Sequence, residues 1–187
     1  NWQLHLKGDC WFVTEVDDGT IWAGGGFNTA SGLHTYDGKM WRKQMDGRFW
    51  DLLQAADGTI WAASDSGLYR WDTGVWRKDL SGACNMLHQS AGGPLWAVGE
   101  GIGVYRHNGI KWQKEIGGEF WLVKEVANGD IWVASKTGAG LQYYNGANWH
   151  KVPTSVQQGW VTDFLQTADG TIWVVHPFNF SSLSKFD

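Results

Sequence analysis

The 187-residue chain is 43% hydrophobic and 18% charged, a balance that is sufficient for a folded domain with a packed core. Its net charge of −4 comes from scattered residues without a basic stripe, which excludes nucleic acid as an expected partner. No apolar run approaches the roughly 20 residues of a membrane-spanning helix, so membrane insertion is not expected.

One short pattern recurs five times along the chain, a tight turn followed by an apolar strand that contains tryptophan. These tryptophans lie 35 to 41 residues apart, at Trp22, Trp61, Trp96, Trp132 and Trp173. No helical periodicity competes with the pattern. A repeat of this length predicts radially or linearly stacked supersecondary units.

The first element expected is an outer strand over residues 1–6, followed by units over about 9–44, 48–80, 83–116, 119–152 and 159–187. The second unit is the clearest, because Asp57-Gly58 separates two apolar segments and both turn residues tolerate positive φ. Two further short strands follow within each unit. The fifth unit ends before its fourth strand, and we expect residues 1–6 to supply it. The sequence therefore predicts one all-β domain, a five-bladed β-propeller with four-stranded blades.

Asp57-Gly58-Thr59-Ile60-Trp61, followed by Ser66-Gly67-Leu68-Tyr69-Arg70-Trp71-Asp72, resembles the two-component-regulator propeller repeat. The resemblance covers all five units and is best in the second. It implies blade architecture and a sensing or recognition role, and an extracellular or periplasmic location is favoured. A tryptophan-rich, five-bladed ring is also similar in plan to small propeller lectins.

Positions that are alike in every unit are expected to serve packing. Tryptophans of the second and fourth strands, Trp2 included, are therefore assigned to the core, whereas Trp71 has no evident counterpart. A polar residue recurs near the end of each first strand, at Glu15, Gln54, Gln89, Glu125 and Gln166. Its recurrence favours structural hydrogen bonds in or beside a central channel, and a central ion or ligand ring is the alternative.

The start of the first strand of each unit breaks the symmetry, because three tryptophans are matched there by Asn85 and Thr162. This end lies opposite the Asp-Gly turns, where the longer loops gather. The predicted ligand-binding residues are Trp11, Trp50, Asn85, Trp121, Trp160, Phe27, Glu100 and Phe178. Aromatic faces beside amide and hydroxyl groups suit sugars or a quaternary ammonium group, and the resemblance favours sugars. The alternative is that these tryptophans cap the core.

No catalytic residue, metal site or cofactor is predicted, because the six histidines have no metal-site spacing and no nucleophile elbow or phosphate loop is present. His88 is expected to be a hydrogen-bonded interior histidine, and Cys10 and Cys84 are expected to be free, buried thiols.

The leading hypothesis is a non-enzymatic recognition module for a glycan or another small polar ligand. The second is a structural or protein-interaction propeller from a larger sensor. A lyase or hydrolase is the third, and it requires His88, Lys124 and Glu125 to share one cleft.

Overall fold

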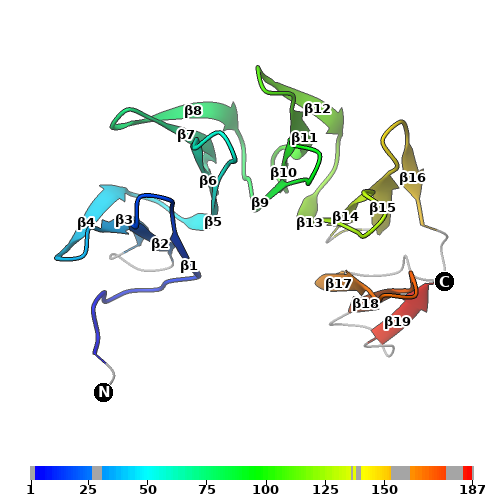
Figure 1. The fold of residues 1–187 in the computed structure, drawn as a ribbon, viewed down its shortest axis with the longest axis horizontal. Coiled ribbons are helices and arrows are strands. Elements are labelled where there is room, and N and C mark those ends of the chain that lie inside the picture. Colours follow the sequence, from blue (N-terminus) through cyan, green and yellow to red (C-terminus); the bar gives the residue numbers. More distant parts are fainter. Residues whose placement is uncertain are drawn as a thin grey trace. The chain divides into compact units, whose positions relative to one another are not determined.

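The computed structural model describes residues 3–26, 31–135, 137, 140–152, 161–175 and 183–186. These residues form 19 strands and no helix, arranged in five antiparallel sheets of consecutive strands (Figure 1). The all-β class is therefore confirmed. The chain divides into two compact units, residues 1–87 and 88–187, and the boundary falls inside β9 (Met86–Gln89). No helix in the described part of the chain is long and apolar enough to span a membrane.

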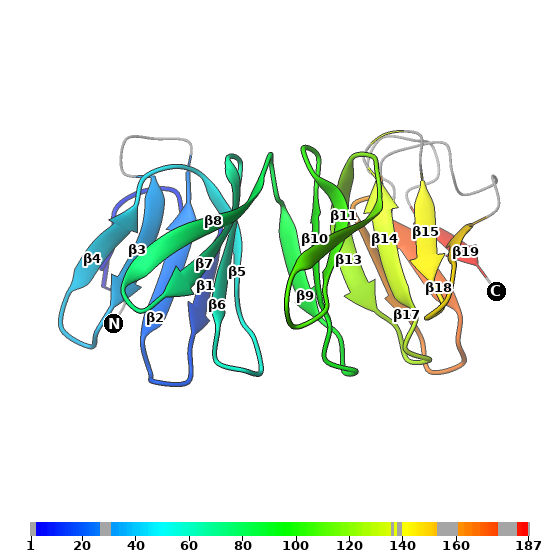
Figure 2. The same cartoon turned by 90° about the horizontal axis from the view of Figure 1, so that it is seen from above.

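The first unit contains two four-stranded meanders. One comprises β1 (Phe12–Glu15), β2 (Ile21–Gly25), β3 (Gly32–Tyr36) and β4 (Trp41–Met45). The other comprises β5 (Phe49–Gln54), β6 (Ile60–Ser64), β7 (Gly67–Asp72) and β8 (Val75–Ser81). Figure 2 shows the tight β1–β2 and β5–β6 turns at the same end of these sheets. The first residues of β1 and β5 consequently lie at the opposite end.

The second unit contains the remaining sheets. Strand β9 continues the pattern with β10 (Leu95–Gly99), β11 (Gly103–His107) and β12 (Trp112–Ile116). The next sheet comprises β13 (Phe120–Glu125), β14 (Ile131–Ser135), β15 (Leu141–Tyr144) and β16 (Trp149–Lys151). The last has three strands in the described residues, β17 (Asp163–Gln166), β18 (Ile172–Val175) and β19 (Leu183–Phe186).

The Asp-Gly turns form as expected but with a different backbone geometry. Only the glycine takes a positive φ, as at Gly58 (φ 84°), and Thr73 is the one other residue in the described ranges that does so. The Asp57 carboxylate instead accepts a hydrogen bond from the Thr59 amide at 2.9 Å. Both turn residues tolerate positive φ, but the aspartate does not adopt it here, and its side chain stabilises the turn by binding the backbone two residues ahead.

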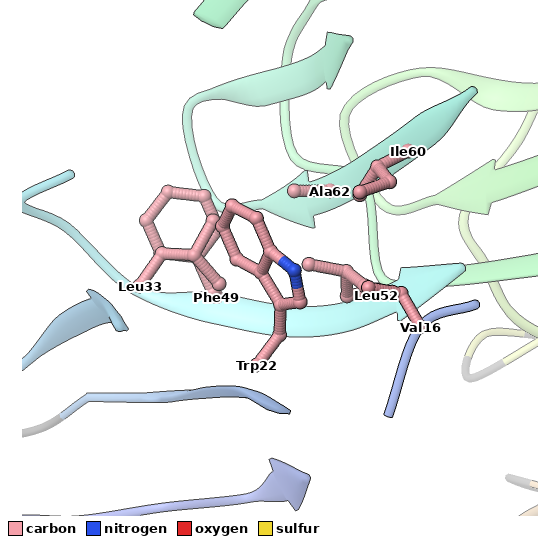
Figure 3. Close-up of a cluster of buried hydrophobic side chains, with 7 residues drawn as sticks. All are labelled: Val16, Trp22, Leu33, Phe49, Leu52, Ile60 and Ala62. Atoms are coloured by element: carbon pink, nitrogen blue, oxygen red, sulfur yellow. The ribbon is translucent and has the colours of Figure 1, made fainter. Parts of the chain in front are cut away.

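The core of the first unit lies between its two sheets and is centred on Trp22. Figure 3 shows the Trp22 indole among Leu33, Phe49 and Leu52, and Val16, Ile60 and Ala62 complete the buried cluster. Trp61, Trp96 and Trp132 of the second strands of three other sheets are as deeply buried as Trp22, with exposed fractions of 2–5% for the four. Burial of such large apolar surfaces is the dominant favourable term for the sheet packing. The assignment to the core is confirmed for these four tryptophans, whereas the other described tryptophans assigned to it are only half-buried, namely Trp173, Trp41, Trp76, Trp112 and Trp149.

Trp71 does have a counterpart in the other sheets, contrary to expectation. Each four-stranded sheet pairs an aromatic residue of its third strand with the tryptophan at or next to the start of the fourth strand. The ring centroids are 5.2 Å apart for Tyr36–Trp41, 5.1 Å for Trp71–Trp76, 5.0 Å for His107–Trp112 and 5.4 Å for Tyr144–Trp149. Trp22 contacts Trp71 and Trp76 edge-on, at 5.8 and 5.5 Å. The varied identity of the third-strand residue hid this recurring aromatic pair from comparison by tryptophan alone.

The N-terminal segment belongs to no strand between Gln3 and Lys7, and residues 1–2 lie outside the described residues. The outer strand predicted for residues 1–6 is therefore not formed by its described part. The blade count, the closure of a ring and the assignment of residues 1–187 to a single domain stay predictions.

Candidate functional site

The structure brings Trp11 and Trp50 together at the start of β1 and β5. Their rings are stacked, with centroids 4.4 Å apart and an interplanar angle of 28°. Trp11 is fixed to its own sheet by the hydrogen bond from its amide to the Gly24 carbonyl, at 2.8 Å. Trp50 lies where the β5–β6 register shifts, between Phe49 and Asp51. Both tryptophans are half-buried, so they combine packing with partial exposure.

Asn85 directly precedes β9, and the residues on both sides of it are tied to the β5–β6 sheet. The Cys84 amide donates to the Ser64 carbonyl at 2.8 Å. The Leu87 amide donates to the Asp51 carboxylate, also at 2.8 Å. Asn85 is thereby held at a fixed place relative to the strand that carries Trp50. Three predicted ligand-binding residues, Trp11, Trp50 and Asn85, thus belong to one part of the first unit.

Asp51 is a component of this region that the sequence reasoning missed. Its carboxylate accepts hydrogen bonds from the Leu52 amide at 2.9 Å and the Leu87 amide at 2.8 Å. Burial nevertheless raises the pKa of Asp51 to about 6, because desolvation of the charged form outweighs the two backbone donors. Burial, with a smaller contribution from Asp51, also raises the pKa of the fully buried Cys84 thiol and keeps it protonated.

Comparison of the repeats already distinguishes Asp51 from the residues at equivalent positions. The equivalent positions of three other units hold the apolar residues Phe12, Met86 and Leu122, and the fifth holds Asp163. The symmetry comparison that singled out Trp50 would have selected its neighbour as well.

Trp121 occupies the equivalent of Trp50 in the second unit but has a different partner. Its indole N–H donates to the Thr162 carbonyl at 3.4 Å, at the start of the neighbouring first strand. Lys124 further along β13 forms an ion pair with Asp163 and donates to the Phe164 carbonyl at 3.2 Å. Trp121 therefore contributes a hydrogen-bonded contact between two sheets.

Four other residues were predicted to bind ligand. Glu100 is exposed in the turn between β10 and β11 of the second unit. Phe27, Trp160 and Phe178 lie outside the described residues.

The recurring polar residues near the ends of the first strands tie neighbouring sheets together. The side-chain carbonyl of Gln54 accepts from the Asp17 amide at 2.7 Å, in the hairpin turn of the preceding sheet. The same contact recurs from Ala91 to Glu125 at 2.6 Å and from Ala127 to Gln166 at 2.8 Å. The side-chain amides of Gln54, Gln89 and Gln166 also donate to their own turns, at Gly58, Gly93 and Gly170. These bonds support the structural interpretation. In the described ranges no group of three or more His, Cys, Asp or Glu residues could hold a metal ion.

His88 is a hydrogen-bonded histidine, as expected. Its Nε2 accepts from the Glu125 amide at 3.3 Å, which places the proton of the neutral ring on Nδ1. Burial lowers the pKa of His88, although the nearby Glu125 carboxylate opposes the shift. Lys124 contacts Asp163 instead, so the three residues required for a catalytic cluster divide between two separate contacts.

The two cysteines are free, but only one is buried. Cys84 is fully enclosed, whereas Cys10 is exposed just before β1 begins. The expectation that both thiols are buried was wrong for Cys10, because the segment that precedes β1 leaves its side chain exposed.

The sequence matches no protein-family model and no curated protein. The structure is similar to the extracellular domain of a hybrid two-component system from B. thetaiotaomicron, with a TM-score of 0.67 at 12% identity, covering 89% of this chain and 25% of that one. It is also similar to the extracellular domain of a one-component system from the same organism, with a TM-score of 0.70 at 15% identity, covering 96% of this chain and 31% of the other.

Virginiamycin B lyase from Staphylococcus aureus has a TM-score of 0.71 at 13% identity, covering 98% of this chain and 72% of the lyase. The chain spans only a quarter to a third of the two extracellular domains. At these identities the likeness concerns the fold alone. The tryptophan-containing repeats are consistent with the two-component-regulator propeller repeat, and the sheets have a propeller-like fold.

Proposed function

We propose that this chain is a non-enzymatic recognition module that binds carbohydrate through Trp11, Trp50 and Asn85. The observation that carries the proposal is the stacked, half-buried Trp11–Trp50 pair at the start of two neighbouring first strands. Trp121, Trp160, Phe27, Glu100 and Phe178 stay further predicted ligand contacts. The proposed architecture is a five-bladed propeller.

Two stacked indoles provide a rigid, flat surface that loses little conformational entropy on binding. The C–H faces of a sugar ring pack against such a surface, and sugar hydroxyls exchange hydrogen bonds with an amide. Asn85 supplies an amide whose backbone is anchored on both sides, by the bonds of Cys84 and Leu87. The combination of an aromatic surface and a fixed polar group supports the proposal that this region binds a small polar ligand.

The neighbours support a sensing context outside the cytoplasm. Two of them are extracellular domains of bacterial signalling systems, and we extend this location and a recognition role to the present chain. A protein-interaction propeller within a larger sensor is the second candidate. The lyase alternative has less support, since Lys124 contacts Asp163 and not the His88–Glu125 pair.

Glycan-array screening followed by isothermal titration calorimetry tests the proposal. We expect at least one class of glycan to bind, and Trp50→Ala to weaken that binding at least tenfold. Trp112→Ala is the matched control. Trp112 is also half-buried, but it lies on the fourth strand of another sheet and packs against His107 of the third strand. No signal on the array, together with unchanged tryptophan fluorescence across a panel of sugars, would refute carbohydrate recognition.

A further inference from the structure

Asp51 and Asp163 are the two carboxylates at a place where the repeat otherwise carries apolar residues, and Asp51 lies beside the proposed binding residues. The equivalent positions in three other units hold Phe12, Met86 and Leu122, side chains that need no hydrogen-bond partner. A largely buried carboxylate at such a place opposes folding unless it is compensated, because water solvates the charged form better than the protein does. The repeat thus tolerates an apolar residue here, and a carboxylate requires another explanation.

The contacts of Asp51 give this explanation. One carboxylate oxygen accepts from the Leu52 amide of its own strand, and the other accepts from the Leu87 amide of β9. Asp51 directly follows Trp50, and Leu87 lies two residues beyond Asn85. The carboxylate therefore connects the segment that carries the aromatic surface to the segment that carries the amide.

The surroundings of Asp51 make this connection sensitive to its charge. The groups that face the carboxylate are the two backbone donors, from β5 and β9, and the Cys84 thiol from the segment before β9. No ion pair joins Asp51 to a basic side chain in the described part of the chain. Hydrogen bonds to an ionised acceptor are stronger than those to a neutral one, so protonation weakens both backbone bonds.

We propose that Asp51 is a positioning residue that holds Asn85 at its distance from Trp50, and that protonation of Asp51 loosens this arrangement and lowers ligand affinity. The inference rests on the proposed carbohydrate site for its effect on binding. Its effect on the geometry of the region is independent of any ligand.

Nuclear magnetic resonance of the ligand-free protein tests the geometric part. We expect the Leu87 amide, the Asn85 side-chain amide and the Trp50 indole N–H to shift together between pH 5 and 8, with a midpoint near the Asp51 pKa of about 6. Trp50→Phe assigns the indole signal. Asp51→Asn should abolish this common transition, whereas Asp163→Asn, the equivalent change in the second unit, should leave it in place. A Leu87 transition without any change at Asn85 and Trp50 would overturn the proposal.

Calorimetric titration with a glycan identified on the array tests the functional part. We expect Asp51→Asn to weaken binding at pH 7.5 several-fold without lowering the Tm, and to remove the loss of affinity that the wild-type protein shows between pH 7.5 and 5. Asp51→Leu, which introduces the residue found at position 122, should weaken binding in the same way and control for the amide of asparagine. Unchanged affinity in both variants would overturn the positioning role. Absence of any glycan ligand would refute the proposed function, and the magnetic resonance experiment would still decide the role of Asp51.

Discussion

Replacing Asp51 with asparagine should change how the stability of the protein depends on pH. Burial raises the pKa of Asp51 from 3.8 to about 6, so the folded state binds a proton more tightly than the unfolded state does. A group of this kind contributes stability that is fully present below the unfolded pKa and is lost as the pH rises through the folded pKa. The loss should therefore occur between about pH 4 and pH 6.

The magnitude follows from the shift. Each pKa unit corresponds to 1.36 kcal/mol, so a shift from 3.8 to about 6 amounts to roughly 3 kcal/mol. Asparagine does not titrate, so the free energy of unfolding of the Asp51→Asn variant lacks this contribution at every pH. The stability of Asp51→Asn relative to the wild-type protein should consequently rise by up to about 3 kcal/mol between pH 4 and pH 7.5.

Urea unfolding at a series of pH values between 4 and 7.5 measures this difference directly. Asp37→Asn is the matched control of opposite sign, because backbone hydrogen bonds from Met40 and Lys39 lower the pKa of Asp37. The stability that the Asp37 carboxylate contributes is lost as the pH falls, so its removal should flatten the acid side of the profile. A constant difference between Asp51→Asn and wild type across the series would refute the burial argument.

Three further changes have expected outcomes. Thr73→Asn should raise the Tm and stabilise the protein by about 1 kcal/mol, since Thr73 is β-branched and has a φ of 45° in a two-residue hairpin turn; a lowered Tm would contradict this. Trp22→Ala should destabilise the first unit by about 3–5 kcal/mol in chemical denaturation, because it empties the centre of the core in Figure 3. His88→Gln should reduce acid sensitivity: burial lowers the pKa of His88, so its stability contribution is present above the unfolded pKa and lost as the pH falls. An identical acid-unfolding midpoint in both proteins would count against the last expectation.

The candidate site was predicted in part. Comparison of the five units identified Trp11, Trp50 and Asn85 as departures from symmetry, and the structure places them in one part of the first unit. The same comparison did not reveal that Trp11 and Trp50 stack on each other while Trp121 donates to a backbone carbonyl. Each arrangement depends on the residue that faces the tryptophan from the neighbouring sheet. That residue lies 39 positions away for the Trp11–Trp50 pair and 41 positions away for Trp121 and Thr162.

The amino-acid sequence was sufficient to predict the strands, the tight turns and the burial of Trp22, Trp61, Trp96 and Trp132. These features depend on the alternation of apolar and polar residues along one strand and on turn side chains, such as Asp57, that bind the backbone two residues ahead. Residues that are close in the sequence therefore suffice to specify them. Only the tertiary structure decided the environment of Asp51 and the aromatic pairing of Trp71. Both depend on how separate sheets pack, and the pKa of Asp51 is raised only because folding buries its carboxylate.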